Sequence, residues 1–378
     1  MARIKLGILG GGGDSLIGIL HRIAANMYDR YEIVGGVFNP VWEENIGFAK
    51  ELGLSENRIY KNFEELITKE LQLPEDERMQ VVSVLTPNFL HYPMAKKLVE
   101  SKFNVICEKP MTMNYVEARS LKQLVADNQV VFAVTYTYTG YPMVREMRHL
   151  IQSGKIGDIQ RVDVQYYQGW INPIIHDKEK RAETWRLDPK KSGISCCIGD
   201  VGTHAFDLAE FVTGKHVKEI LADLNYLYDD NQMDIDGTIL LRLDERTKGV
   251  LRASQIATGE ENNLRISVYG REGGLKWQQE NPNFLEYLPG DGAKQTLTRA
   301  QLYNSSLSND GTKMPPGHPE GIFDAMGNIY KGVSKAINGE LFDDGEFPSV
   351  IDGARGMDFI EKVVASHKEG NVWKKLDE

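Results

Sequence analysis

The sequence predicts an α/β protein of two domains, a parallel sheet covered by helices in residues 1–139 and a second α/β domain in residues 140–378. Short apolar runs alternate with amphipathic segments in the first domain, which is typical of a parallel sheet with helices on both faces. A run of four glycines, Gly10 to Gly13, follows the first apolar run. After Gly140 the rhythm changes to strands with a single apolar face, as in a half-covered sheet.

The first domain begins with a strand over residues 5–9, because an apolar run there leads directly into the glycines. Amphipathic spacing predicts the helices, and nearly continuous apolar runs predict the buried strands. The expected elements are a helix over 16–27, a strand over 32–38, a helix over 45–52, a short strand near 59–60, a helix over 63–69, a strand over 80–85, a helix over 91–101, a strand over 104–107, a helix over 115–127 and a strand over 130–134.

The second domain is expected to begin with a helix, and alternating apolar residues then predict strands. These elements are a helix over 143–153 and strands over 161–167, 238–243, 249–255 and 264–269. The polar segment 172–195 is expected to be a loop reaching over the site, and 291–316 a second long loop. Amphipathic helices over 323–337 and 351–367 complete the domain.

The composition limits the class of protein, with 41% hydrophobic and 26% charged residues as in ordinary globular proteins. A net charge of −10 argues against a nucleic-acid or anionic-membrane partner. No apolar run approaches the roughly 20 residues of a membrane span, and no signal-peptide pattern precedes the first strand. Cys107, Cys196 and Cys197 suit neither a disulfide framework nor a zinc site. We therefore expect a cytoplasmic protein with reduced thiols and no metal.

The glycine run indicates a nucleotide. Dinucleotide-binding folds place glycines between the first strand and the first helix, where the backbone approaches the pyrophosphate and the helix packs on the strand. Gly10 and Gly12, or Gly11 and Gly13, occupy the first two glycine positions. The third position of a strict G-x-G-x-x-G is not a glycine, and the next glycine is Gly18. The order of strand, glycine run and helix nevertheless predicts a Rossmann fold.

The end of the second strand indicates which cofactor is preferred. An acidic residue there binds the ribose 2′-hydroxyl of NAD, whereas an arginine favours the 2′-phosphate of NADP. This chain has Asn39 and Pro40, so neither device is present. Because no basic residue stands at the tip, the sequence favours NAD, with NADP as the alternative.

Three residues are candidates for proton transfer. Lys109 follows the apolar run 104–107, and a lysine at the carboxyl end of a buried strand in a nucleotide-binding fold can act as an acid/base or anchor the substrate. Asp200 and His204 stand four residues apart, on one face if Asp200 opens a helix. On spacing alone, an exposed turn lysine, a helix cap and a core histidine explain the three equally well.

Together these motifs resemble the glucose-fructose oxidoreductase / inositol dehydrogenase (Gfo/Idh/MocA) family. The resemblance rests on the glycine turn, Thr86-Pro87-Asn88 with His91 behind it, Glu108-Lys109-Pro110, and Gly199-Asp200-Val201-Gly202-Thr203-His204. Residues 139–145 and 317–321 are similar to a subgroup of glucoside and anhydrosugar dehydrogenases. The chain departs from that subgroup at Tyr136-Thr137 and at 193–197, which leaves the substrate preference open.

The resemblance implies a Rossmann domain followed by an α/β domain with an open, mostly antiparallel sheet that supports homodimers or homotetramers. It implies an NAD(P)-dependent enzyme that transfers a hydride between nicotinamide and a ring hydroxyl or keto group of a sugar, glycoside or cyclitol, with C3 of a glucoside favoured. In this scheme Lys109 polarises the reacting oxygen or shares the proton transfer, His204 is the acid/base, and Asp200 orients the substrate or supports His204.

The resemblance also assigns the remaining site residues. The cofactor-binding residues are predicted to be Gly10, Gly11, Gly12, Gly13, Asn39, Thr86, Pro87, Asn88, His91, Glu108 and Lys109. The substrate-binding residues are predicted to be Lys109, Tyr138, Trp170, Trp185, Arg186, Asp200, His204 and His318, since aromatic faces stack on sugars and polar tips bind hydroxyls. Two other functions stay open, an NAD-retaining enzyme that cleaves glycosides by transient oxidation and elimination, and a non-catalytic NAD-binding regulator.

Overall fold

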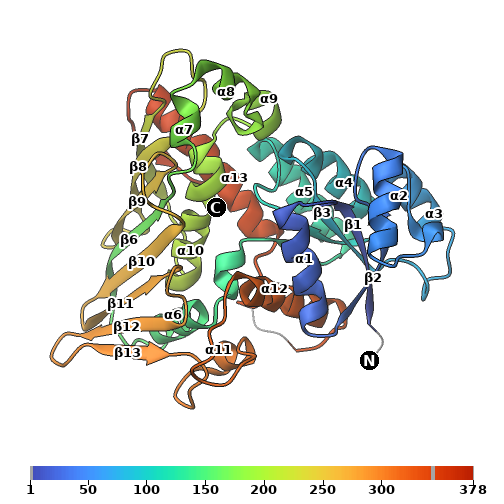
Figure 1. Ribbon diagram of the computed structural model, residues 1–378. Coiled ribbons are helices and arrows are strands. Elements are labelled where there is room, and N and C mark those ends of the chain that lie inside the picture. Colours follow the sequence, from blue (N-terminus) through green and yellow to red (C-terminus); the bar gives the residue numbers. More distant parts are fainter. Residues whose placement is uncertain (1–2, 342–344, 378) are drawn as a thin grey trace. The chain divides into compact units, whose positions relative to one another are not determined.

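The computed structural model describes residues 3–341 and 345–377, which form two compact units (Figure 1). The first unit takes in the chain up to Thr112, then Val116–Thr137 and Phe323–Gly353. The second takes in Met113–Tyr115, Tyr138–Ile322 and the chain from Ala354 onward. The first unit thus adds residues 323–353 to the predicted range 1–139, because a late helix packs on it.

The first unit is built on a five-stranded sheet in the order β2-β1-β3-β4-β5, in which every pair is parallel. Its strands are β1 (Ile4–Gly10), β2 (Tyr31–Val37), β3 (Val81–Leu85), β4 (Asn104–Cys107) and β5 (Phe132–Val134). Strand β3 is buried along its whole length, as expected for a strand covered on both faces. Because β1 pairs with β2 on one side and β3 on the other, the carboxyl ends of β1 and β3 form the switch point where such folds bind ligands.

The helices of this unit connect its strands, except for the last, which comes much later in the chain. They are α1 (Leu16–Met27), α2 (Trp42–Glu51), α3 (Phe63–Glu70), α4 (His91–Glu100), α5 (Tyr115–Asn128) and α12 (Ile322–Ile337). Helix α1 has the predicted bounds, whereas α2 begins three residues before the expected position 45. The expected short strand near 59–60 is a single bridge between Gly36 and Ile59. Helix α12 lies beside α1, where Tyr28 Oη donates to Asn328 Oδ1 at 2.6 Å (Figure 1).

The second unit is built on a nine-stranded sheet in the order β13-β12-β11-β10-β6-β9-β8-β7-β14. Its strands are β6 (Ile159–Tyr167), β7 (Glu219–Asn225), β8 (Asp236–Arg242), β9 (Lys248–Ser254), β10 (Asn263–Gly270), β11 (Gly273–Gln278), β12 (Phe284–Pro289), β13 (Gln295–Thr298) and β14 (Lys374–Lys375). The pairs are antiparallel except for β6 with β9. Both sheets confirm the predicted fold class, although β7, β11, β12, β13 and β14 had no counterpart among the expected strands.

Helices cover one face of this sheet. Helix α6 (Pro142–Gln152) packs on β11 and β12, and α10 (Thr203–Thr213) packs on β6, β9 and β10. Helix α13 (Val350–Lys368) begins in the first unit and continues into the second. Residues alternate between buried and accessible along β8 and β10, which explains why the sequence predicted a half-covered sheet.

The two segments predicted to be loops contain regular structure. Residues 172–192 form α7 (Asn172–Ile175), α8 (Lys178–Glu183), a 3₁₀ turn (Trp185–Leu187) and α9 (Pro189–Ser192), and residues 291–316 contain β13 and α11 (Ser306–Asp310). Asp177 and Asp188 cap α8 and α9 by accepting backbone N–H groups. These helices are too short to show an apolar period, so the caps were the signal that the sequence offered.

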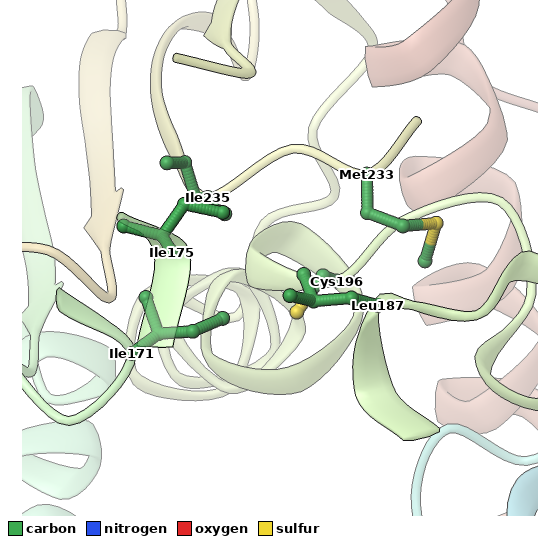
Figure 2. Packing of buried hydrophobic residues seen from close by; sticks show 6 residues of the cluster. All are labelled: Ile171, Ile175, Leu187, Cys196, Met233 and Ile235. Carbon is green, nitrogen blue, oxygen red and sulfur yellow. The ribbon is translucent and has the colours of Figure 1, made fainter. Parts of the chain in front are cut away.

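Part of the helical segment 172–192 is anchored by a small buried cluster, shown in Figure 2. Its members are Ile171, Ile175, Leu187, Cys196, Met233 and Ile235. Leu187 directly follows Trp185 and Arg186 in the chain, so burial of Leu187 restrains the backbone that carries exposed Trp185 and partly exposed Arg186. Among the helices of the described residues, none combines the length and the hydropathy that spanning a bilayer requires.

Candidate functional site

The glycine loop after β1 has the backbone that a dinucleotide fold requires. Gly10 and Gly11 have φ angles of +85° and +67°, in the left-handed region that glycine favours. A Cβ on Gly12 would lie 2.6 Å from Phe38 O, and one on Gly18 would lie 1.9 Å from Gly11 O. Gly18 therefore allows the close helix–loop packing that the third glycine provides in the strict motif. It stands later in the chain than that glycine because the loop here is longer.

The loop leads into an open helix N-terminus. Ser15 caps α1, and its Oγ accepts the N–H of Gly18 at 3.2 Å. The first turn of α1 has no acidic residue, so the positive end of the helix is not neutralised by a side chain of its own. A glycine cradle in which Gly10, Gly11 and Gly12 leave no room for a Cβ, followed by such a helix end, fits the pyrophosphate of a dinucleotide.

Two turns at neighbouring strand ends are joined by His91. The ring is buried, and its Nε2 lies 2.7 Å from Thr86 O while its Nδ1 lies 2.9 Å from Pro110 O. Burial lowers the pKa of His91, whereas its hydrogen bonds with the two carbonyl oxygens act in the opposite direction. Both nitrogens are engaged within the protein, so His91 holds together the turn after β3 and the turn that contains half-buried Lys109. The Lys109–Pro110 peptide bond is cis.

Glu108 belongs to a buried hydrogen-bond network. Its Oε1 accepts from Thr135 Oγ1 at 2.6 Å and lies 2.8 Å from His21 Nε2. Tyr330 Oη, from α12, lies 2.7 Å from His21 Nδ1 and 2.8 Å from Ser83 Oγ. Burial tends to raise the pKa of Glu108, but the hydrogen bonds and positive charge of His21, with Thr135 and Lys109, lower it to about 2. Glu108 is thus an ionised support for the residue that follows it.

Asp200 lies in a π-helical turn, Ile198–Gly202, that precedes α10. The condition that Asp200 opens an α-helix, under which Asp200 and His204 would share a face, is therefore not met. π-turns often occur at functional sites. The turn is fixed by buried Asp234, whose carboxylate accepts the N–H of Cys196 at 3.1 Å and of Ile198 at 2.8 Å. Burial raises the pKa of Asp234, and these hydrogen bonds oppose the shift.

The carboxylate of Asp200 is oriented from two sides. Fully buried Gln255 donates from Nε2 to Asp200 Oδ2 at 2.8 Å, and the thiol of Cys196 donates to Gln255 Oε1 at 3.3 Å, which fixes the amide orientation. On the other side, Arg186 Nε lies 3.6 Å from Asp200 Oδ2. The Arg186 guanidinium carbon lies 5.5 Å from the ring centroid of Trp170 and 4.7 Å from that of Trp185.

His204 packs against two tyrosines in the same unit. Its ring meets the ring of Tyr138 edge-on, with centroids 4.9 Å apart. Tyr138 Oη lies 2.5 Å from Tyr166 Oη, and Tyr166 donates to Asn262 Oδ1 at 2.6 Å. Burial raises the pKa of both tyrosines, which keeps their hydroxyls protonated. The Tyr138 hydroxyl is thus already engaged, and its substrate contact stays a prediction.

The structure gathers the predicted site residues into one group in each unit. Thr86, Pro87, His91, Glu108 and Lys109 lie at the ends of β3 and β4, with the glycine loop at the switch point. Tyr138, Trp170, Trp185, Arg186, Asp200 and His204 form the second group. His318 lies on an exposed turn, and no hydrogen bond, ion pair or ring contact joins it to the described residues of that group.

Several supporting residues escaped the sequence analysis. They are His21, Thr135 and Tyr330 around Glu108, and Asp234, Gln255, Tyr166 and Asn262 around Asp200 and Tyr138. No local pattern marks them, because each acts on a partner distant in the chain. Among the described residues, no group of three or more His, Cys, Asp or Glu side chains is arranged to hold a metal ion.

Comparison with known proteins identifies both parts of the chain. Residues 4–136 match the model of an oxidoreductase family with an NAD-binding Rossmann fold, and residues 144–276 match the GFO/IDH/MocA C-terminal domain. The chain is 30% identical to the uncharacterized oxidoreductase YfiI of Bacillus subtilis over 98% of this chain and 96% of that protein. It is 24% identical to the glucose-6-phosphate 3-dehydrogenase of the same organism over 94% of each chain. The structure of an inositol dehydrogenase homolog complexed with NAD+, from Azotobacter vinelandii, is 29% identical and superimposes with a TM-score of 0.91 over 99% of this chain and 97% of that one.

Proposed function

The chain belongs to the Gfo/Idh/MocA family of NAD-binding oxidoreductases, and from this premise we propose that it oxidises a ring hydroxyl, or reduces a ring keto group, of a sugar, glycoside or cyclitol. The names of the relatives support this substrate class, since one is a dehydrogenase of a sugar phosphate and another an inositol dehydrogenase homolog. The position C3 of a glucoside is the favoured site of oxidation in this proposal, and the physiological direction is either oxidation or keto-sugar reduction.

The proposal assigns a role to each proton-transferring side chain. When bound, the nicotinamide supplies the hydride acceptor or donor. In this proposal His204 is the acid/base for the reacting hydroxyl, and Lys109 polarises the reacting oxygen or shares the proton transfer. Asp200, already oriented by Gln255, accepts a hydrogen bond from the substrate. Trp170 and Trp185 flank Arg186 and give the sugar an apolar surface beside a cationic one.

One observation carries this proposal above a non-catalytic regulator: Lys109, Asp200 and His204 are all present, and their surroundings are built to hold them. A protein that only binds NAD does not need buried Glu108, with its pKa of about 2, next to Lys109 in the chain. Nor does it need Asp200 to be oriented by a buried amide, that of Gln255, which the Cys196 thiol holds in place. The proposal includes a cytoplasmic location, which suits three buried thiols that are not joined in disulfides.

The test is the appearance of reduced nicotinamide with NAD and NADP separately, over a panel of glucosides, anhydrosugars, free hexoses and inositols. Reduction of NAD or NADP with one group of compounds defines the substrate class. Absence of net reduction across the panel, with cofactor retained in the purified protein, would favour the enzyme that cleaves glycosides by transient oxidation. In that case the products of glycoside cleavage, and not reduced nicotinamide, are what chromatography should detect.

A further inference from the structure

The tip of strand β2 has a carboxylate beside it, which comes from the next helix. Asn39 follows β2, and its Nδ2 donates to Glu44 Oε2 at 2.7 Å. The Asn39 Oδ1 accepts the N–H of Val41 at 2.8 Å, so the amide is fixed at both ends. Asn39 is partly exposed and Glu44 is exposed, which leaves the pair accessible to a ligand.

This tip lies against the glycine loop. The N–H of Gly12 donates to Phe38 O at 3.1 Å, and Asn39 is the next residue. Buried Asn45 ties the first turn of α2 to the same place, because its Oδ1 accepts the N–H of Phe38 at 2.7 Å and its Nδ2 donates to Tyr60 O at 2.8 Å. Glu44 precedes Asn45, so its position relative to the tip is set by a buried contact.

In Rossmann folds the end of the second strand binds the adenosine ribose, whose 2′-oxygen carries a hydrogen in NAD and a phosphate in NADP. We infer that Glu44, oriented by Asn39, selects NAD over NADP in this chain. Its carboxylate accepts a hydrogen bond from the 2′-hydroxyl and repels a 2′-phosphate. The acidic residue that the second strand lacks is thus supplied from α2, where no strand-end motif would reveal it.

The charges around the tip favour the same cofactor. A helix N-terminus attracts phosphate, but the first turn of α2 contains two carboxylates, Glu43 and Glu44, and its N-cap residue, Val41, contributes no side-chain hydrogen bond. Lys61 brings a cation to this turn, with its Nζ 5.8 Å from the ring centroid of Trp42. Arg22 lies over the Phe48 ring of the same helix, but its Nη1 is already engaged by Gly11 O at 2.6 Å. The two adjacent carboxylates of the first turn therefore still disfavour a dianionic phosphate there.

The test is isothermal titration calorimetry of the full-length protein with NADH and NADPH, without substrate. The native protein should bind NADH at least about tenfold more tightly. Glu44→Gln should narrow the preference for NADH over NADPH by roughly tenfold or more, since hydrogen bonds to charged groups are stronger than those between neutral groups. Glu44→Lys should reverse the preference. Glu43→Gln, which removes the same charge from the same turn, is the matched control and should leave the ratio within about threefold.

Three outcomes would overturn the assignment. These are a native preference for NADPH, equal effects of Glu44→Gln and Glu43→Gln, or no binding of either cofactor to the native protein. Because the titration needs no sugar, a failure of the proposed substrate class leaves the result intact. Conversely, activity with a sugar combined with an unchanged NADH/NADPH ratio in Glu44→Gln would contradict this inference alone.

Discussion

At the residue scale, the proposed chemistry depends most directly on Lys109 and His204. Lys109→Ala and His204→Ala should each lower kcat by about 10²–10⁴-fold, the usual contribution of a positioned acid or base. NADH affinity in calorimetry should remain within a few-fold, because the glycine loop is untouched. His216→Ala is the control for the histidine, since its side chain is 68% exposed. Unchanged kcat in either variant, or parallel loss of NADH binding and turnover, would remove the proposed roles.

Gln255 tests whether the orientation of Asp200 matters. Gln255→Met keeps the volume of this buried side chain and removes the donor that lies 2.8 Å from Asp200 Oδ2. We expect kcat/KM to fall by roughly tenfold to a hundredfold, since a hydrogen bond to a carboxylate contributes about 1.5–3 kcal/mol. Cys196→Ser keeps a donor to the amide oxygen and should retain most of the activity. A lower Tm with unchanged kcat/KM would make Gln255 purely structural.

At the element scale, the packing of α1 on the glycine loop and the helix propensity of alanine have opposite effects on stability, so two Gly→Ala variants can distinguish them. Gly18→Ala places a Cβ 1.9 Å from Gly11 O, and we expect it to cost about 3 kcal/mol of unfolding free energy and to abolish NADH binding. Gly47→Ala is the matched control on α2, because its Cβ would meet nothing within 4 Å. That change should stabilise the protein by up to about 1 kcal/mol. Urea unfolding and NADH titration of both variants decide the matter; similar results for the two would contradict the packing argument.

The Glu108 network ties α1, the end of β4 and α12 together, and it should be visible in the pH dependence of stability. The pKa of Glu108 is about 2 in the folded protein, below the value near 4.3 of an unfolded chain. Its stabilisation is therefore complete above about pH 5 and is lost as the pH falls toward 2. The loss amounts to roughly 3 kcal/mol.

Urea unfolding between pH 7 and pH 3 measures this effect. Glu108→Gln should be less stable at pH 7 and should lose less stability on acidification than the native protein does. Glu51→Gln, at an exposed carboxylate on α2, should follow the native curve. Parallel curves for native protein and Glu108→Gln would show that the network does not hold the carboxylate ionised.

The sequence predicted elements that carry their own pattern. Continuous apolar runs marked the buried parallel strands, and the glycine loop and the Glu108-Lys109-Pro110 turn marked the candidate site, because these signals are local. The helices in 172–192 were not predicted, since their caps and the burial of Leu187 depend on contacts outside the segment. Likewise, the sequence did not predict that Glu44 lies beside Asn39. Their hydrogen bond depends on the position at which α2 begins.

At the scale of the whole molecule, the uncovered face of the nine-stranded sheet is where we propose that copies of the chain associate. Leu240 on β8 is 40% exposed and lies opposite Val250 of β9. Light scattering should give a dimer or tetramer, and Leu240→Asp should shift it toward the monomer, because a charge replaces apolar surface in the contact. Leu341→Asp, at a leucine 97% exposed in the first unit, should change nothing. A native monomer would contradict the proposal.

The return of α12 to the first unit bears on how the chain folds during synthesis. His21 and Tyr330 are hydrogen-bonded although 309 positions separate them in the chain, and Ser83 is hydrogen-bonded to the same tyrosine. The amino-terminal strands are synthesised first, so His21 and Ser83 have no Tyr330 to bond until nearly the whole chain has been made. A fragment that stops at residue 139 would therefore lack α12, and the surface of α1 that α12 contacts would be left uncovered.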